Sequence, residues 1–249
     1  MKTVVAIQAR MTSTRLPGKV LLPLAGVPLL QRVVERAERI SGADQICIAL
    51  PFGADHDPIA EWAQDWPALS LVRGPEDDVL ARFGEVAAQT SADEIVRITA
   101  DCPLLEPCVA EAVMALRRSC RAPLAATALE SGYPTGMDVE VFTRTALEAA
   151  LLGAHDPYER EHVTAFLWRR PEEFPAVYLD RRPDRRSLRL AVDTREDYEL
   201  VSQLYSALHR DGECFGLDEI EAYLASHPEM AAINRGVEQH PYEFVPHVG

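Results

Sequence analysis

The stretch from Gln8 to Lys19 combines basic side chains with small hydroxyl side chains, a composition suited to binding an anion. It reads QARMTSTRLPGK and follows an apolar segment that is typical of a buried strand. In α/β proteins the loop that leaves such a strand is a common place for phosphate groups. Arg10 and Arg15 offer guanidinium forks to phosphate oxygens, and Lys19 offers a compact charge. The segment therefore predicts a phosphate-binding loop, with an exposed, solvated basic loop as the alternative.

The loop is not a Walker P-loop, because Ser13 and Val20 stand where that motif needs Gly and Ser or Thr. Lys19 gives a further indication. The chain contains 23 arginines but only two lysines, Lys2 and Lys19. A lysine in the middle of this loop, in so arginine-rich a chain, suggests a role that arginine cannot fill.

Two aspartates follow predicted strands at the end where a ligand would lie. Asp101 comes directly after the segment EIVRIT, and Asp193 directly follows LRLAV. Two carboxylates facing bound phosphates suit Mg²⁺, which takes one or two carboxylates together with phosphate oxygens and waters. Each aspartate could instead cap the N-terminus of the following helix. The nearby basic loop favours the metal, because all three features would meet at the same edge of the sheet.

Strands and helices alternate along the first half of the chain, which predicts a mostly parallel sheet with helices on both faces. The second half is less regular, and we expect its arginine-rich stretch 181–189 to be an exposed connection or hairpin. Thr194 and Asp197 have the spacing of a capping box at the start of a helix. We expect strands at 3–8, 45–50, 69–72, 94–99, 124–129, 138–142, 177–180 and 188–192, and helices at 29–40, 57–66, 77–90, 107–119, 144–152, 158–169, 195–210 and 216–224.

The composition is that of an acidic globular protein, with 249 residues, 25 basic and 39 acidic side chains and a formal net charge of −14. This balance argues against a nucleic-acid-binding protein. Residues 1–34 nevertheless contain no acid, and this basic head suggests a small anionic ligand. The apolar runs are too short for a membrane span or a signal peptide, and the five cysteines form no CxxC pair, so we expect a reduced, cytoplasmic protein. We also expect a single domain over 1–249, with no clear periodicity after about residue 235.

A set of ordered motifs resembles the cytidylyltransferase family that makes CMP-activated acidic sugars. The motifs are QARMTSTRLPGKVLLPLAGVPLL, RGPEDDVLARF, VRITADCPL, YPTGMDVEVF, EREHVT and AVDTREDYELV. Within that family they are most similar to the branch named for the spore-coat polysaccharide biosynthesis protein SpsF, from about residue 3 to about residue 234. The resemblance implies a single nucleotidyltransferase domain, glycosyltransferase-A-like and Rossmann-like, with a mixed, mostly parallel sheet flanked by helices. It also implies CTP as donor, an acidic small-molecule acceptor, Mg²⁺ as cofactor, pyrophosphate as product and a homodimer.

The resemblance further implies roles for the residues that match its motifs. Lys19, Arg15 and Asp101 would be catalytic, and Asp101 and Asp193 would bind Mg²⁺. Thr99 stands where better-known sugar-acid cytidylyltransferases carry a Gln that contacts base or ribose. The residues expected to bind the nucleotide are Gln8, Ala9, Arg10, Ser13, Arg15, Lys19, Arg73 and Thr99.

The acceptor would lie against the turn-strand motif YPTGMDVEVF and the segment EREHVT. Carboxylates in the first of these could accept hydrogen bonds from sugar hydroxyls, although the same residues would also suit a hairpin turn with an edge strand. The residues expected to bind the acceptor are Tyr133, Asp138, Glu140, Arg160 and His162.

His155, Glu159 and His162 have a spacing that could place a transition-metal site on one helix face. We disfavour this interpretation, because Asp156 and Pro157 separate His155 from the predicted helix.

Three other functions share parts of the pattern. A cytidylyltransferase acting on a phosphonate or another small acid would carry the same loop and aspartates. A glycosyltransferase on a related fold would need a second acid two residues after Asp101, where Pro103 stands. A non-catalytic nucleotide-binding protein has no need of Arg15, Lys19 and both aspartates together.

Overall fold

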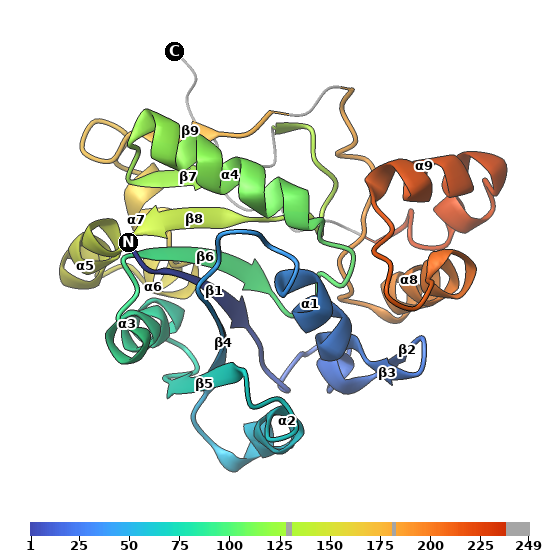
Figure 1. Ribbon diagram of the computed structural model, residues 1–249, viewed down its shortest axis with the longest axis horizontal. Helices are drawn as coiled ribbons and strands as arrows, with labels where there is room; N and C mark the ends of the chain where they lie inside the picture. Colours follow the sequence, from blue (N-terminus) through green and yellow to red (C-terminus); the bar gives the residue numbers. More distant parts are fainter. Residues whose placement is uncertain (128–130, 181–182, 238–249) are drawn as a thin grey trace.

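The computed structural model describes residues 1–127, 131–180 and 183–237, and within them one large sheet forms the centre of the molecule (Figure 1). In the part of the chain so described, the sheet has seven strands in the order β5-β4-β1-β6-β8-β7-β9. β1 pairs in parallel with β4 and β6, and β4 with β5, whereas β8 runs antiparallel to both β6 and β7. The expected mixed, mostly parallel sheet is therefore confirmed. The bounds are β1 Thr3–Gln8, β4 Gln45–Pro51, β5 Leu69–Gly74, β6 Glu94–Thr99, β7 Leu124–Ala126, β8 Glu140–Thr143 and β9 Ala176–Tyr178.

Helices cover both faces of this sheet, as the alternating pattern predicted. Buried residues of α1, α4 and α8 belong to one apolar cluster, and buried residues of α3 and α5 belong to a second cluster on the opposite face. The bounds are α1 Leu29–Ala37, α2 Asp57–Ala63, α3 Val79–Thr90, α4 Pro107–Cys120, α5 Arg144–Gly153, α6 Pro157–Glu161, α7 Ala165–Trp168, α8 Arg195–Leu208 and α9 Leu217–Ser226, with 3-10 turns η1 Lys19–Leu21, η2 Ala54–His56 and η4 Met230–Ala232 and a small hairpin of β2 Pro23–Leu24 and β3 Val27–Pro28.

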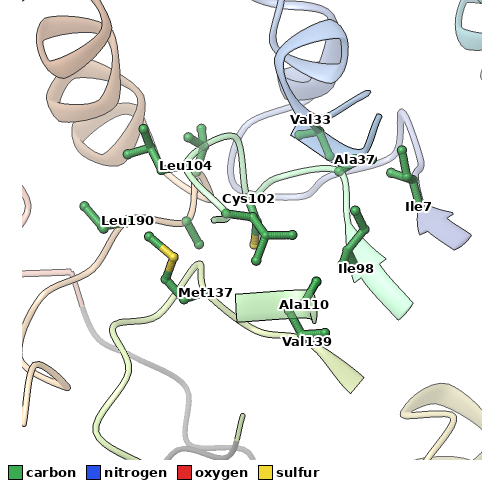
Figure 2. Packing of buried hydrophobic residues seen from close by; sticks show 14 of the residues in the cluster. Ile7, Val33, Ala37, Ile98, Cys102, Leu104, Ala110, Met137, Val139 and Leu190 are labelled. Carbon is green, nitrogen blue, oxygen red and sulfur yellow. The ribbon is translucent and has the colours of Figure 1, made fainter. Parts of the chain in front are cut away.

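Alternation of side chains along β1 explains why both faces are apolar. Val5 and Ile7 point into the cluster under α1 and α4, while Val4 and Ala6 point into the cluster under α3 and α5. All four are completely buried. Figure 2 shows part of the first cluster, to which strands, helices and the loops between them all contribute, with labelled side chains Ile7, Val33, Ala37, Ile98, Cys102, Leu104, Ala110, Met137, Val139 and Leu190.

The strand expected at 124–129 ends at Ala126, and residues 128 and 129 of that expectation lie outside the described residues. Two other expected elements differ from the structure in kind. The helix predicted at 158–169 is broken into α6 and α7, because Val163 between them has a left-handed backbone with φ 52°. The strand predicted at 188–192 is not one: it is extended and buried at Leu190 to Val192, but only Arg189 forms a single bridge, to Thr135. Its apolar side chains are explained by packing into the core cluster and not by a place in the sheet.

None of the helices in the described ranges is both long enough and apolar enough to cross a membrane.

Candidate active site

A cavity of about 650 Å³ opens at the edge of the sheet where β1 and β6 end. Parallel strands bring the loops that follow them to this edge, which is where ligands bind in open α/β sheets. Gln8 is the last residue of β1 and pairs in register with Thr99, the last residue of β6, so both loops start side by side. Of the residues expected to form the site, the cavity is lined by Gln8, Arg10, Ser13, Arg15, Lys19, Thr99, Asp101, Asp138, Glu140, His162 and Asp193.

The basic loop after β1 folds back on itself before the chain enters η1. The carbonyl of Met11 accepts hydrogen bonds from the backbone N–H groups of Ser13 and Gly18, both at 3.0 Å. Gly18 has φ 70°, a left-handed conformation that glycine adopts without strain, and η1 begins at the next residue. The loop is tied to its surroundings by a hydrogen bond that Thr12 Oγ1 donates to Glu76 Oε1 at 2.5 Å. This closed turn places Lys19 over the sheet edge.

Lys19 lies between the two predicted aspartates and forms ion pairs with both. Its Nζ donates hydrogen bonds to Asp101 Oδ2 at 2.7 Å and to Asp193 Oδ1 at 2.8 Å. The Lys19 side chain is only 8% exposed. Burial by itself lowers the pKa of Lys19 and raises that of Asp101, but the ion pair outweighs burial in both. The pKa of Lys19 consequently lies above its ordinary value and that of Asp101 below it, so both groups are charged.

Two arginines complete this centre from the side of Asp193. Arg15 Nη2 lies 3.1 Å from Asp193 Oδ2, and Arg189 Nη2 donates to the same oxygen at 2.5 Å. Arg15 is 40% exposed and can therefore turn toward a ligand, whereas Arg189 is 6% exposed. Arg189 is also bound through Nε to Asp197 Oδ1 at 3.0 Å. We infer that Arg189 fixes Asp193 in place while Arg15 faces the cavity.

The backbone around Asp193 is held by the capping box that the sequence predicted. Thr194 Oγ1 accepts from the Asp197 N–H, and Asp197 Oδ2 accepts from the N–H groups of Asp193 and Thr194. A further hydrogen bond joins the loop that carries Asp101 to the loop that carries Asp193, because the Val192 N–H donates to the Asp101 carbonyl at 2.8 Å. The two aspartates therefore belong to one rigid pair of loops.

The Asp193 loop also packs against the turn that leads to β8. Gly136 has φ 101°, and a Cβ placed on it would lie 2.5 Å from the Ala191 nitrogen and 2.6 Å from the Leu190 carbonyl carbon. Only a residue without a side chain permits this approach of two backbones. This close contact places the Asp193 loop beside the turn that precedes Asp138 and Glu140.

The donor set at the centre fits a hard divalent cation. The carboxylates of Asp101 and Asp193 converge on a single positive charge, the Lys19 ammonium, and carboxylate oxygens are the ligands that Mg²⁺ and Mn²⁺ prefer. Within the described residues, no group of three or more His, Cys, Asp or Glu is placed to hold a metal by itself. A cation here would accordingly need oxygens from a bound ligand besides the two carboxylates.

The opposite half of the cavity carries a second carboxylate cluster with different electrostatics. Asp138 accepts a hydrogen bond from the Gly136 N–H at 2.9 Å, and no ion pair to it is found among the described residues. Its side chain is exposed to the cavity, yet the protein atoms around it desolvate the carboxyl and raise the pKa of Asp138 to about 6, with Asp101 and Glu140 adding to the effect. Burial likewise lowers the pKa of His162, so its ring is neutral at pH 7.

Four of the expected site residues do not line the cavity. Ala9 is buried under the loop, and Tyr133 packs against the apolar core. Arg73 donates to Asp57 Oδ1 at 2.6 Å and to the Gly53 carbonyl at 3.1 Å, which directs it away from the cavity. Arg160 donates through Nε to Asp78 Oδ2 at 2.9 Å and so ties α6 to the N-terminus of α3. Their proposed ligand contacts stay predictions.

The sequence did not reveal several lining residues, among them Arg97, Arg189, Trp168 and Tyr178. Arg97 lies inside the strand EIVRIT, where a single charged residue reads as a solvated position. The spacing of four between Arg189 and Asp193 gave no indication, because residues four apart are neighbours on a helix and not on the strand predicted here. Only the fold of this segment brings the two side chains into an ion pair. Trp168 and Tyr178 had no recognisable indication.

The disfavoured metal site on α6 has no counterpart in the described residues. Glu159 instead accepts a hydrogen bond from Arg170 Nη1 at 2.8 Å. His162 packs against Tyr158, with ring centroids 4.1 Å apart and ring planes tilted by 44°, and lines the cavity.

Comparisons with known proteins show which family the chain resembles. A family model described as Cytidylyltransferase matches residues 4–237. The chain is 32% identical to the spore coat polysaccharide biosynthesis protein SpsF of Bacillus subtilis, over 80% of this chain and 84% of that protein. It is 34% identical to the 3-deoxy-manno-octulosonate cytidylyltransferase of Anaeromyxobacter dehalogenans, over 71% of this chain and 74% of that protein. The solved structure of a cytidylyltransferase from Leptospira borgpetersenii is similar with a TM-score of 0.87 and 28% identity, covering 97% of this chain and 99% of that chain.

Proposed function

The chain belongs to the cytidylyltransferase family and is a nucleotidyltransferase, and from this premise we propose that it transfers CMP from CTP to a small acceptor with release of pyrophosphate. The observation that supports this most strongly is the centre in which Lys19, Arg15 and two aspartates gather under the basic loop. Such a centre offers cations to a triphosphate and carboxylates to a metal.

The reaction that this centre suits is an in-line displacement at the α-phosphorus of CTP. A bond forms between an acceptor oxygen and the α-phosphorus, and the bond from that phosphorus to the bridging oxygen of pyrophosphate breaks. Positive charge near the phosphates stabilises the charge that develops on them, and Lys19 and Arg15 would supply it. Arg10 and Ser13 line the same part of the cavity and would bind the outer phosphates.

Asp101 and Asp193 would hold a divalent cation, which we propose is Mg²⁺. When bound, such a cation neutralises phosphate charge and orients the triphosphate for displacement. The chain itself contributes the rigid pair of loops that keeps both carboxylates at one point. Lys19, which occupies that point without ligand, would move onto the phosphates.

The acceptor would lie in the half of the cavity lined by Asp138, Glu140 and His162. We propose an acidic sugar or a related small acid, since one curated relative acts by its name on 3-deoxy-manno-octulosonate. The attacking hydroxyl must lose a proton, and Asp138, with its pKa raised to about 6, is the carboxylate in this half best matched to receive it near neutral pH.

The direct test is a pyrophosphate-release assay in Mg²⁺ that crosses the four nucleoside triphosphates with sugar acids, other small acids and phosphonates. We expect release with CTP and at least one acceptor, and none without acceptor. Activity restricted to UTP would contradict the cytidylyl assignment. The chain offers a matched control, because Lys2→Met alters the other lysine, which lies outside the cavity, and should release pyrophosphate at the unmodified rate.

A further inference from the structure

Arg97 is a nearly buried cation at the floor of the cavity, between its two halves. It lies on β6 opposite Ala6 of β1 and Glu140 of β8, and its side chain is 8% exposed. A charge at this depth costs free energy unless hydrogen bonds and an opposite charge compensate it. The partners of Arg97 therefore indicate what the residue does.

The guanidinium of Arg97 is held from both sides. Nε and Nη2 donate to the same atom, Gln8 Oε1, at 3.1 and 2.8 Å. Nη1 donates to Glu140 Oε2, whose carboxylate also accepts through Oε1 from Thr164 Oγ1 at 2.5 Å. Thr164 is completely buried. The guanidinium is thus anchored at Glu140 and aims two N–H groups at Gln8.

This arrangement decides which way the Gln8 amide faces. A guanidinium has only donors, so its two N–H groups can pair with the amide oxygen but not with the amide NH₂ group. A flipped amide would place donors against donors. The NH₂ group of Gln8 is therefore the end left to meet another partner, and no hydrogen bond within the described residues uses it. Gln8 lines the cavity beside Thr99, on the side where the nucleotide is expected.

The geometry points to Arg97 as a positioning residue that makes Gln8 a fixed hydrogen-bond donor toward the nucleobase and so favours cytosine. Cytosine presents N3 and O2 as acceptors on its Watson–Crick edge, whereas uracil presents an N3–H donor there. Uracil keeps acceptors at O2 and O4, so the discrimination requires the fixed NH₂ group to be aimed at N3, where it is complementary to cytosine and opposes uracil. This inference rests on the proposed function and adds the residue pair that selects the base.

Gln8→Glu provides the sharpest test, because it keeps the shape and the oxygen that Arg97 binds but replaces the NH₂ group by an oxygen. We expect CTP to bind about tenfold more weakly and UTP no more weakly, so that the ratio of affinities for CTP and UTP falls about tenfold. If Gln8 serves only to satisfy Arg97, the new carboxylate pairs with it at least as well, and the ratio stays unchanged. Isothermal titration with CTP and UTP in Mg²⁺, without acceptor, measures both affinities.

Arg97→Lys tests the positioning role itself. Lysine keeps a charge for Glu140 but lacks the fork that directs two donors to one oxygen. We expect Arg97→Lys to lower the ratio of affinities for CTP and UTP as Gln8→Glu does. In a protein that already carries Gln8→Leu, adding Arg97→Lys should leave that ratio unchanged. An unchanged ratio in Arg97→Lys would overturn the inference. Arg144→Lys is the matched control, since Arg144 is 40% exposed and pairs with Glu148 far from the cavity.

The two levels of the proposal fail differently in this experiment. An unmodified protein that binds neither CTP nor UTP contradicts the proposed function. An unmodified protein that favours CTP, together with a Gln8→Glu protein that favours it equally, contradicts only the role of Gln8 and Arg97. Thermal unfolding of each variant shows whether a lost affinity reflects a lost fold.

Discussion

Asp101 and Asp138 are two carboxylates of one cavity whose pKa values move in opposite directions. Asp101 contacts the Lys19 ammonium at 2.7 Å, and its pKa is lowered. Asp138 is bound to a backbone N–H, stands near Asp101 and Glu140, and has its pKa raised to about 6. One half of the cavity therefore holds the paired charges of Lys19 and Asp101. The other half holds Asp138, a carboxyl that can gain or lose a proton near neutral pH.

Burial raises the pKa of both carboxyls, and the Lys19 ammonium reverses this effect at Asp101 alone. A paired, ionised carboxylate suits the binding of cations and stays ionised over a wide pH range. A carboxylate with a pKa near neutral suits hydrogen bonding to hydroxyls and proton transfer. Under the proposed function, the half of the cavity with paired charges would bind phosphates and metal, and the half with Asp138 would bind the acceptor.

The largest effect should come from removing Lys19. We expect Lys19→Met to lower pyrophosphate release by at least about 10²- to 10³-fold, because the variant loses the cation nearest to the expected α-phosphate. Circular dichroism should show an intact fold, since Arg15 and Arg189 still neutralise Asp193. Full activity in a well-folded Lys19→Met protein would show that the paired half of the cavity is not the reaction centre.

Metal binding without nucleotide should show the next largest effect, in the opposite direction. The Lys19 ammonium occupies the point between Asp101 and Asp193 where a cation would bind, so Mn²⁺ and the ammonium compete. We expect Lys19→Met to bind Mn²⁺ about tenfold more tightly than the unmodified protein in the absence of CTP, as measured by electron paramagnetic resonance. Lys2→Met is the control. Equal affinities in all three proteins would mean that Lys19 leaves the aspartates accessible.

The third prediction concerns Asp138 and the pH dependence of stability. A carboxyl with a raised folded-state pKa binds more protons in the folded than in the unfolded chain between its ordinary pKa and about 6. The Asp138 contribution to the free energy of unfolding therefore falls as pH rises through this window, and it stays low above it. We expect Asp138→Asn to stabilise the protein at pH 7 but not at pH 4. Urea titrations at both pH values measure this, and equal effects at both would contradict the raised pKa.

The smallest effect should come from Arg160. It pairs with Asp78 and does not line the cavity, and both side chains are partly exposed. We expect Arg160→Met to lower the free energy of unfolding by about 1 kcal/mol or less, in urea denaturation. A large loss of pyrophosphate release at unchanged stability would instead support the acceptor contact that the motif EREHVT suggested.

Sequence periodicity predicted most of the sheet and the paired half of the site. The strands at 3–8 and 94–99 have the predicted bounds, because they are apolar on both faces and end at polar residues. Lys19 and Asp101 were predictable from residue type and from their place in the loops after the strands at 3–8 and 94–99. Asp193 was named because it follows a predicted strand that the structure does not contain, although its carboxylate does pair with Lys19. The single helix predicted at 158–169 was wrong, because Val163 has a left-handed backbone, and the next residue, the buried Thr164, donates a hydrogen bond to Glu140. Periodicity carries no information about such a long-range hydrogen bond.

Arg97 was missed for a related reason. A single arginine within an apolar strand reads as one solvated position, and only the register of β1, β6 and β8 shows that Gln8 and Glu140 flank it. The same limit applies to Arg73 and Arg160, where a motif match named the residue but the fold directs the side chain to Asp57 or Asp78. Local pattern identifies charged residues, and tertiary contacts decide which of them face the ligand.

The close backbone approach at Gly136 has a consequence for how this enzyme can diversify. Any methyl group at that position would push the Asp193 loop away from the turn that carries Asp138, since a Cβ would lie 2.5 Å from the Ala191 nitrogen. Position 136 carries no functional group, yet we expect it to tolerate as few substitutions in a saturation library as Lys19, Asp101 and Asp193. Residue 138, by contrast, can exchange its side chain on a fixed backbone, whereas Glu140 is held by its ion pair with Arg97. Under the proposed function, new acceptor preferences can therefore evolve by substitutions in the wall of the cavity. The distance between the Asp193 loop and the turn before β8 stays fixed, because only glycine fits at position 136.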